Sequence, residues 1–142
     1  MSRARFNATK FKPNRTQAIV INMNPKSLAR ERRQLRAEID SALDGEDDPL
    51  EAYDHFVKWT IKNFAEGDPD SGLVELLEEA TRKFKNDPNY KGDLRYLKLW
   101  CQYARQVEKP ASVYAFLASK DIGSGYALLY EEYAKALEAD GR

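Results

Sequence analysis

One segment in the middle of the chain carries apolar side chains on two faces of a helix rather than on one. At about 100° per residue, the segment 90–107 places small apolar residues on one side and large, mostly aromatic residues on the other. Leaving either face in water would forgo several kcal/mol of burial, so we expect neighbours on both flanks. The small face holds Leu94, Leu97, Cys101 and Ala104, and the large face holds Tyr96, Leu99, Trp100, Tyr103 and Val107. This pattern predicts the central helix of a stack of helices.

Signals for the start of a helix recur along the rest of the chain. Proline follows a capping residue at Asn24-Pro25 and at Asp48-Pro49, and proline's fixed φ suits the first helical position. Ser71 and Ser124 are expected to cap two later helices. Apolar residues at helical spacing predict six helices, at about residues 25–44, 50–64, 73–84, 94–109, 113–117 and 126–137.

The fold class follows from the spacing of the apolar residues. No segment alternates with a period of two over a useful length, so we expect an all-α protein. Short connections between paired helices favour a tetratricopeptide-like stack of about six antiparallel helices. We expect a flexible basic arm at 1–23 and a helical domain at 24–142. The first helix has a thin apolar stripe, made of Leu28, Leu35, Ile39 and Leu43, and should lie against the body of the domain.

The net charge of zero hides an uneven distribution of charge. Residues 1–36 contain ten Lys and Arg and one acid, whereas the remaining 106 residues contain thirteen Lys and Arg and twenty-two Asp and Glu. A basic arm on an acidic body is typical of a chain that binds nucleic acid or another acidic surface. It is also typical of an arm that folds back onto its own body or stays solvated. The sequence leaves both alternatives open.

No arrangement of residues predicts catalysis. His55 is the only histidine, and its neighbours at a spacing of four are Glu51 and Trp59, so we interpret it as a packed or surface residue. Cys101 is the only cysteine and falls among Leu and Ala, where burial raises the pKa of a thiol and a structural role is expected. The segment 123–125 is too short for a phosphate-binding loop. The sequence therefore predicts no catalytic residues, no cofactor and no metal.

Several motifs resemble, in order, the N-terminal region shared by the Bub and Mad spindle-checkpoint proteins. They cover about residues 47–140, and the ordered string is more specific than any of its parts. The motifs are Asp48-Pro49-Leu50, Trp59-Thr60, Asn63-Phe64, Ser71-Gly72-Leu73-Val74-Glu75-Leu76-Leu77-Glu78, Asp93-Leu94-Arg95-Tyr96-Leu97-Lys98-Leu99-Trp100, Ile122-Gly123 and Tyr130-Glu131-Glu132-Tyr133-Ala134.

The resemblance implies a tetratricopeptide-like domain that docks a checkpoint protein to the kinetochore. In that family the domain binds a short amphipathic helical motif of the large kinetochore scaffold protein, in a groove on its convex side. By position, the resemblance assigns the groove to Cys101 and Tyr103 on the central helix and to Tyr133 and Leu137 on the last helix. Other checkpoint proteins are further partners that it suggests.

The resemblance also bears on where the chain acts and on how it ends. It implies a nuclear and kinetochore localisation with a cytoplasmic pool, and a domain that is not itself an enzyme, although some longer members carry a C-terminal kinase domain. Members of the family continue with another helical hairpin beyond the position of Arg142. We therefore expect a truncated array whose last helix exposes a face that longer members cover.

Overall fold

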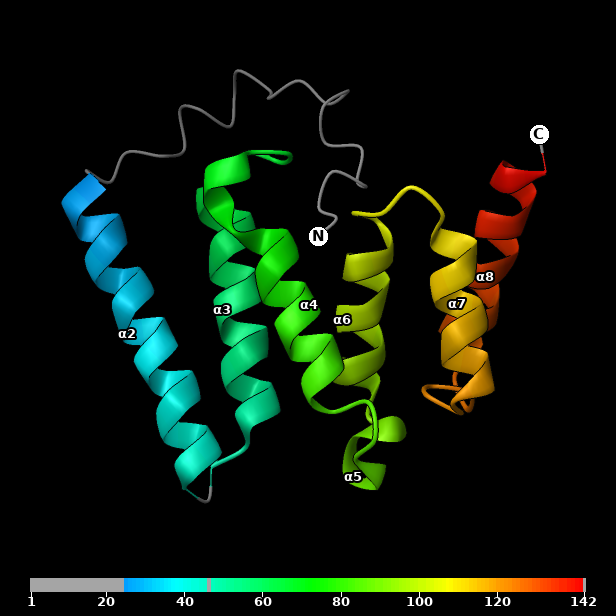
Figure 1. Ribbon diagram of the computed structural model, residues 1–142, viewed down its shortest axis with the longest axis horizontal. Helices are drawn as coiled ribbons and strands as arrows, with labels where there is room; N and C mark the ends of the chain where they lie inside the picture. Colours follow the sequence, from blue (N-terminus) through cyan, green and yellow to red (C-terminus); the bar gives the residue numbers. More distant parts are fainter. Residues whose placement is uncertain (1–24, 46, 142) are drawn as a thin grey trace. The chain divides into compact units, whose positions relative to one another are not determined.

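The computed structural model describes residues 25–45 and 47–141, and all regular secondary structure in this part of the chain is helical (Figure 1). It contains seven α-helices, a short 3-10 helix and no strand. No helix in these ranges is long and apolar enough to cross a membrane. The elements are α2 (Pro25–Asp44), α3 (Pro49–Asn63), η3 (Pro69–Ser71), α4 (Leu73–Lys83), α5 (Pro88–Lys91), α6 (Leu94–Ala104), α7 (Pro110–Ser119) and α8 (Ala127–Asp140). The all-α prediction is confirmed.

The described residues fall into two compact units, and each is considered by itself. Residues 25–45 and 47–76 belong to the N-terminal unit, and residues 77–141 form the C-terminal unit. The boundary lies inside α4. The predicted arm at 1–23 lies outside the described residues and stays a prediction.

Side-chain caps explain why the helices begin where the sequence predicts. Asp48 Oδ1 accepts a hydrogen bond from the backbone N–H of Leu50 at 3.1 Å, and proline occupies the first turn of α3. Ser71 Oγ accepts from the N–H of Leu73 at 3.1 Å, which confirms its predicted role at the start of α4. These bonds satisfy amides that have no partner within the helix.

Two features near helix ends differ from the expectation. The short helix α5 lies in a segment between the third and fourth predicted helices where the sequence predicts no helix, and Asp87 Oδ1 caps it by accepting from the N–H of Asn89 at 2.9 Å. The prediction that Ser124 caps the last helix was wrong, because its hydroxyl donates to Asp121 Oδ1 instead. The N-cap of α8 is Tyr126, which makes no side-chain capping bond.

The N-terminal unit buries one face of α2 against α3. The stripe on α2 is Leu35, Ile39 and Ala42, whereas Leu43, which the sequence placed in it, is 37% exposed. Positions 35, 39 and 42 share one helical face, and Leu43 lies at its edge, rotated about 70° from the centre of the face. The small Ala42 therefore takes the place that the sequence gave to a leucine. The opposing buried residues of α3 include Leu50, Tyr53, Phe56 and Val57.

Polar side chains of the N-terminal unit are bonded to one another across its helices. The Arg32 guanidinium lies 4.9 Å from the centre of the Phe64 ring and donates to the carbonyl oxygens of Asp70 and Ser71, at 3.2 Å each. Trp59 Nε1 donates to a carboxylate oxygen of Glu31 on α2 at 2.8 Å. These bonds tie α2 to α3 and to the turn that precedes α4.

The C-terminal unit is built around α6, whose two faces are both covered. On the aromatic side, the Tyr96 hydroxyl donates to the carbonyl oxygen of Thr81 on α4. The Trp100 ring lies 5.4 Å from the Phe116 ring on α7. On the opposite side Leu97 is fully buried. The predicted central helix is therefore confirmed within this unit.

Candidate functional site

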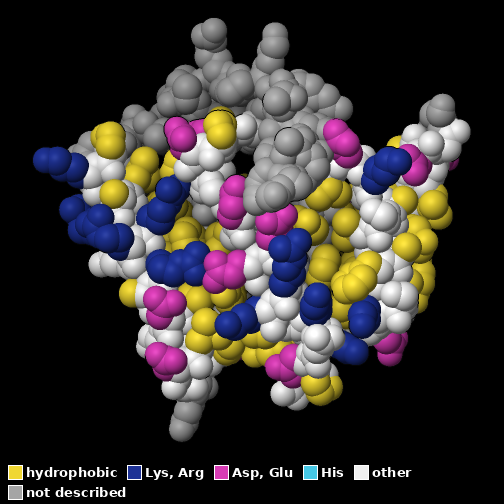
Figure 2. All heavy atoms as spheres, viewed as in Figure 1, with side chains coloured by type: hydrophobic (Ala, Val, Ile, Leu, Met, Phe, Trp, Pro, Cys, Tyr) yellow, Lys and Arg dark blue, Asp and Glu magenta, His cyan; other side chains and the backbone are white. Residues whose placement is uncertain are grey.

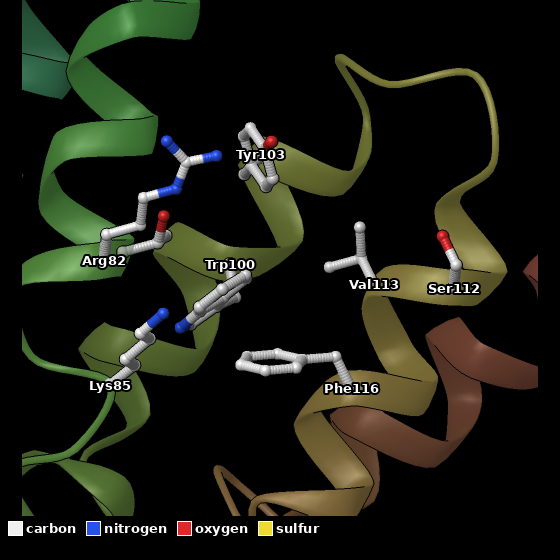
Figure 3. A pocket seen from close by; sticks show the side chains of 8 residues that line it. Arg82, Lys85, Trp100, Tyr103, Ser112, Val113 and Phe116 are labelled. Atoms are coloured by element: carbon white, nitrogen blue, oxygen red, sulfur yellow. The ribbon is translucent and has the colours of Figure 1, made fainter.

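A surface groove of about 270 Å³ opens in the C-terminal unit between α4, α6 and α7 (Figure 3). Ligand pockets for whole small molecules usually exceed about 300 Å³. The groove is therefore better sized for one or two side chains of a partner protein. Its lining residues are Thr81, Arg82, Lys85, Trp100, Tyr103, Ser112, Val113 and Phe116.

The floor of the groove is aromatic and apolar. The Trp100 ring meets the Phe116 ring at 41° and meets the Tyr103 ring edge-on, with the centres of the latter pair 6.0 Å apart. The Tyr103 hydroxyl donates to Glu78 Oε2 on α4 at 3.3 Å, and this bond orients the ring. Figure 2 shows hydrophobic side chains gathered over α6 and α7. Such a floor gains free energy when an apolar side chain covers it.

The α4 side of the groove is basic. Arg82 lies in the last turn of α4 and Lys85 follows the helix, and in Figure 3 both side chains extend toward the rings of α6. Among the described residues, neither cation is paired with a carboxylate. An apolar floor beside two cations favours a partner that is apolar on one side and accepts hydrogen bonds on the other.

The structure separates the four residues that the resemblance assigned to the site. Tyr103 lines the groove. Cys101 is buried on the other face of α6 beside Tyr114, and burial raises the pKa of its thiol. Tyr133 of α8 stacks on Tyr114 with ring centres 6.2 Å apart. Leu137 is 52% exposed on α8. Cys101 and Tyr133 therefore meet through Tyr114, and neither is among the residues that line the groove.

Sequence reasoning missed most of the groove. Arg82, Lys85, Val113 and Phe116 were not singled out as site residues, because they come from separate helices and carry no local motif. Trp100 was placed on the large aromatic face of the central helix. That face was the available signal, because it gathers large apolar side chains on one side of the central helix.

A second groove, of about 800 Å³, lies in the N-terminal unit between α2 and α3 and is acidic. His55 Nδ1 lies 3.2 Å from Glu38 Oε1, and both side chains are more than half exposed. Asp48 in this groove already caps α3. No group of three or more metal-ligating side chains occurs within 25–45 and 47–141. The chemistry of this groove differs from that of the aromatic one.

The fold consists of paired helices with a groove between helices. This arrangement places the chain among the tetratricopeptide-like helical domains. The sequence model of the family described as Mad3/BUB1 homology region 1 matches residues 30–142. The chain belongs to the Mad3/BUB1 homology region 1 family. This homology region is a non-catalytic domain.

Three known proteins show the extent of the similarity. The chain is 39% identical over 129 residues to the mitotic spindle checkpoint component mad3 of Schizosaccharomyces pombe, covering 90% of this chain and 40% of that protein. A chain in a structure described as the crystal structure of mitotic checkpoint complex superposes with a TM-score of 0.78 at 34% identity, over 94% of this chain and 75% of that chain. The N-terminal domain of the mitotic checkpoint component BUB1 superposes with a TM-score of 0.72 at 24% identity, over 82% of this chain and 64% of that chain, and supports the fold.

Proposed function

We propose that this chain is a protein-docking domain of a spindle-checkpoint protein, and that it binds a short amphipathic helical motif of the kinetochore scaffold. The aromatic groove between α4, α6 and α7 is the binding site. Its occupation holds the checkpoint protein at the kinetochore, with nuclear and cytoplasmic pools of unbound protein. The chain contributes the docking surface and carries out no chemistry.

The observation that carries this proposal is the apolar floor on the surface of the C-terminal unit. Val113 and Phe116 are three residues apart on α7 and Trp100 and Tyr103 are three residues apart on α6, so each helix presents its two side chains on one face. Two facing helices with such pairs form a trough lined by side chains. An amphipathic helix fits a trough of this kind by inserting its residues at positions i, i+3 or i+4, and i+7.

The four residues assigned by the resemblance take different parts in this proposal. Tyr103 contacts the bound helix directly. Cys101 is buried on the face of α6 that points away from the groove, so it contributes to packing and does not touch the partner. Tyr133 and Leu137 lie on α8 and belong to a separate surface. We propose that this surface contacts other checkpoint proteins; a similar chain occurs in a structure described as a mitotic checkpoint complex.

A binding titration with the full chain tests the proposal. The probe is a synthetic peptide carrying the helical motif of the kinetochore scaffold, and calorimetry or fluorescence anisotropy measures its affinity. Phe116→Ala and Tyr103→Ala remove parts of the floor, and each should weaken binding about tenfold or more, since residues at the centre of an interface carry most of its energy. Circular dichroism and thermal unfolding of each variant confirm that it is folded.

Two control variants carry matched truncations of exposed side chains outside the groove. Ile61→Ala changes a residue of α3 that is 45% exposed, and Leu137→Ala changes one of α8 that is 52% exposed. Both should bind the peptide as the wild type does. A loss confined to Leu137→Ala would move the site to α8.

Deletion of residues 1–23 separates this function from the alternative that the basic arm binds nucleic acid or another acidic surface. Binding of the scaffold motif should survive the deletion and depend weakly on salt. A chain that binds DNA or RNA only with its arm, with affinity falling steeply as salt rises, and that does not bind the motif, would favour the alternative instead.

A further inference from the structure

The basic side of the aromatic groove has a property that an apolar docking site does not require. Arg82 lies in the last turn of α4 and Lys85 lies in the turn two residues beyond the end of this helix, and both cations line the same groove. Figure 3 shows both side chains directed from α4 toward Trp100 and Tyr103. Within the described residues, no acidic side chain pairs with either of them.

A third donor lies beside these two cations. Trp100 is 6% exposed, and its indole Nε1 is buried with no hydrogen-bond partner among the described residues. In Figure 3 this nitrogen lies on the side of the ring that faces Lys85. The Tyr96 hydroxyl is near enough to interact with the indole N–H. It already donates to the Thr81 carbonyl oxygen, however, and does not form a well-aligned bond with Trp100.

Acceptors are scarce on this side of the groove. The lining residues include no Asp or Glu. The nearby carboxylate of Glu78 accepts from the Tyr103 hydroxyl. A buried donor without an acceptor lowers stability, because its lost hydrogen bond to water is not replaced. A partner that brings an anionic acceptor would recover part of that cost and pair with the two cations.

We propose that the groove selects an acidic partner: an amphipathic helix whose apolar stripe is flanked by an Asp or Glu that reaches Arg82 and Lys85. This proposal rests on the proposed function, because it specifies the partner of the same site. The apolar stripe of the partner contacts Phe116 and Val113. Among peptides with the same stripe, the one that carries the carboxylate binds more tightly. Residues 77–142 contain eleven Lys and Arg and ten Asp and Glu, so the unit that carries the groove has no excess of acids to offset the two cations.

Paired peptides test the selection. Each version of the scaffold-motif peptide carries either Glu or Gln at one position beside its apolar stripe, and each is titrated against the full chain at low salt. At one position the Glu version should bind about tenfold more tightly than the Gln version, as expected for one charge-assisted contact. The ratio should shrink at high salt, because one of the cations is exposed.

Variants of the chain assign this preference to the two cations. In the double variant Arg82→Gln/Lys85→Gln the Glu and Gln peptides should bind equally. Lys98→Gln removes one positive charge from an exposed site on α6 and should leave the tenfold ratio unchanged, which controls for net charge. Trp100→Phe keeps an aromatic floor but removes the N–H, and should lower the ratio partly.

The outcomes separate this proposal from the proposed function. If Glu and Gln versions bind the wild type equally at every position, while Phe116→Ala still weakens binding, the acidic preference is overturned and the docking function stands. If no version binds the wild type, both are overturned. If the preference survives in the double variant, the acid is recognised elsewhere and the assignment to Arg82 and Lys85 is wrong.

Discussion

One arginine and one tryptophan in each of the two units differ in whether their donors are bonded within the unit. In the N-terminal unit Arg32 is bonded to two carbonyl oxygens and lies over the Phe64 ring, and Trp59 Nε1 donates to Glu31. In the C-terminal unit Arg82 and the Nε1 of Trp100 have no such partner among the described residues. Each unit thus offers an arginine and a tryptophan, with their donors used internally in one and left available in the other.

This difference distinguishes residues that stabilise a helical domain from residues that are available to bind a partner. Residue type alone does not decide, because Arg and Trp occur in both roles. The deciding property is whether the donors are satisfied within the unit. Hydrogen-bond donors that lack an acceptor within the unit and lie beside an apolar groove identify the surface that binds a partner.

The largest expected effect concerns the packing of the C-terminal unit. Leu97→Ala deletes a fully buried side chain and should lower the free energy of unfolding by about 3 kcal/mol, measured by urea denaturation. Gly123 has a φ of 72°, and a Cβ there would lie 2.9 Å from Leu97 Cδ1, so Gly123→Ala should cost about 2 kcal/mol. The double variant Leu97→Ala/Gly123→Ala should lose less free energy of unfolding than the sum of the two single variants, because alanine at position 97 relieves the clash with the new Cβ. Additive costs would show that Leu97 and Gly123 are not in contact.

A matched pair of arginine substitutions tests the comparison most sharply. Arg32→Met removes two hydrogen bonds and two cation–π contacts, and should lower the free energy of unfolding by about 2 kcal/mol while leaving peptide affinity unchanged. Arg82→Met should change stability by less than about 0.5 kcal/mol and weaken binding of an acidic peptide. Chemical denaturation and calorimetric titration measure the two quantities. If both variants affect the same quantity, the contrast between the units fails.

The buried tyrosines predict a loss of stability at high pH. Burial raises the pKa of Tyr96 to about 12, above the ordinary value near 10, so the folded state favours the neutral phenol. Its contribution is complete below about pH 10 and is lost as the pH rises toward 12. Tyr96→Phe should lower the free energy of unfolding by about 1 kcal/mol at pH 7 and make its decline between pH 9 and 11.5 shallower. An unchanged alkaline slope would argue against a buried, neutral Tyr96.

The smallest expected effect is at the cap of α6. Hydrogen bonds from Arg95 hold the pKa of Asp93 below its ordinary value, and the carboxylate accepts from the Arg95 side chain at 2.7 Å and from its backbone N–H at 2.9 Å. Its charge therefore adds stability above about pH 4, and this contribution disappears as the pH falls through the lowered pKa. Asp93→Asn keeps the cap and should cost about 0.5 kcal/mol at pH 7 and less at pH 2. An equal cost at both pH values would attribute the effect to the cap alone.

The sequence predicted those parts of the fold that local chemistry determines. Helix starts at Pro25 and Pro49, the cap at Ser71 and the two-faced central helix all depend on residues close together in the chain, and the structure confirms them. The short α5 was missed because a four-residue helix offers too little periodicity to detect. Ser124 was misassigned because Asp121 offers its hydroxyl an acceptor.

The groove was only partly predictable, for a different physical reason. Tyr103 came from the resemblance and does line the groove, but Arg82 and Phe116 are 34 residues apart and meet only after three helices have packed. Likewise, the lack of a hydrogen-bond partner for Trp100 Nε1 can be recognised only when the positions of the surrounding acceptors are known. A sequence pattern shows which faces are apolar, whereas satisfaction of polar groups is a property of the packed unit.

The two indole N–H groups provide the most direct test of the central claim. Trp59 and Trp100 are the chain's two tryptophans, one in each unit, so a nitrogen–proton NMR correlation spectrum of the full chain should contain two indole signals, assigned with Trp59→Phe. On titration with the scaffold-motif peptide, the Trp100 signal should shift in a saturable manner while the Trp59 signal, from the N–H bonded to Glu31, stays in place. Saturable binding that shifts Trp59 and leaves Trp100 unmoved would contradict the assignment of docking to the groove of the C-terminal unit.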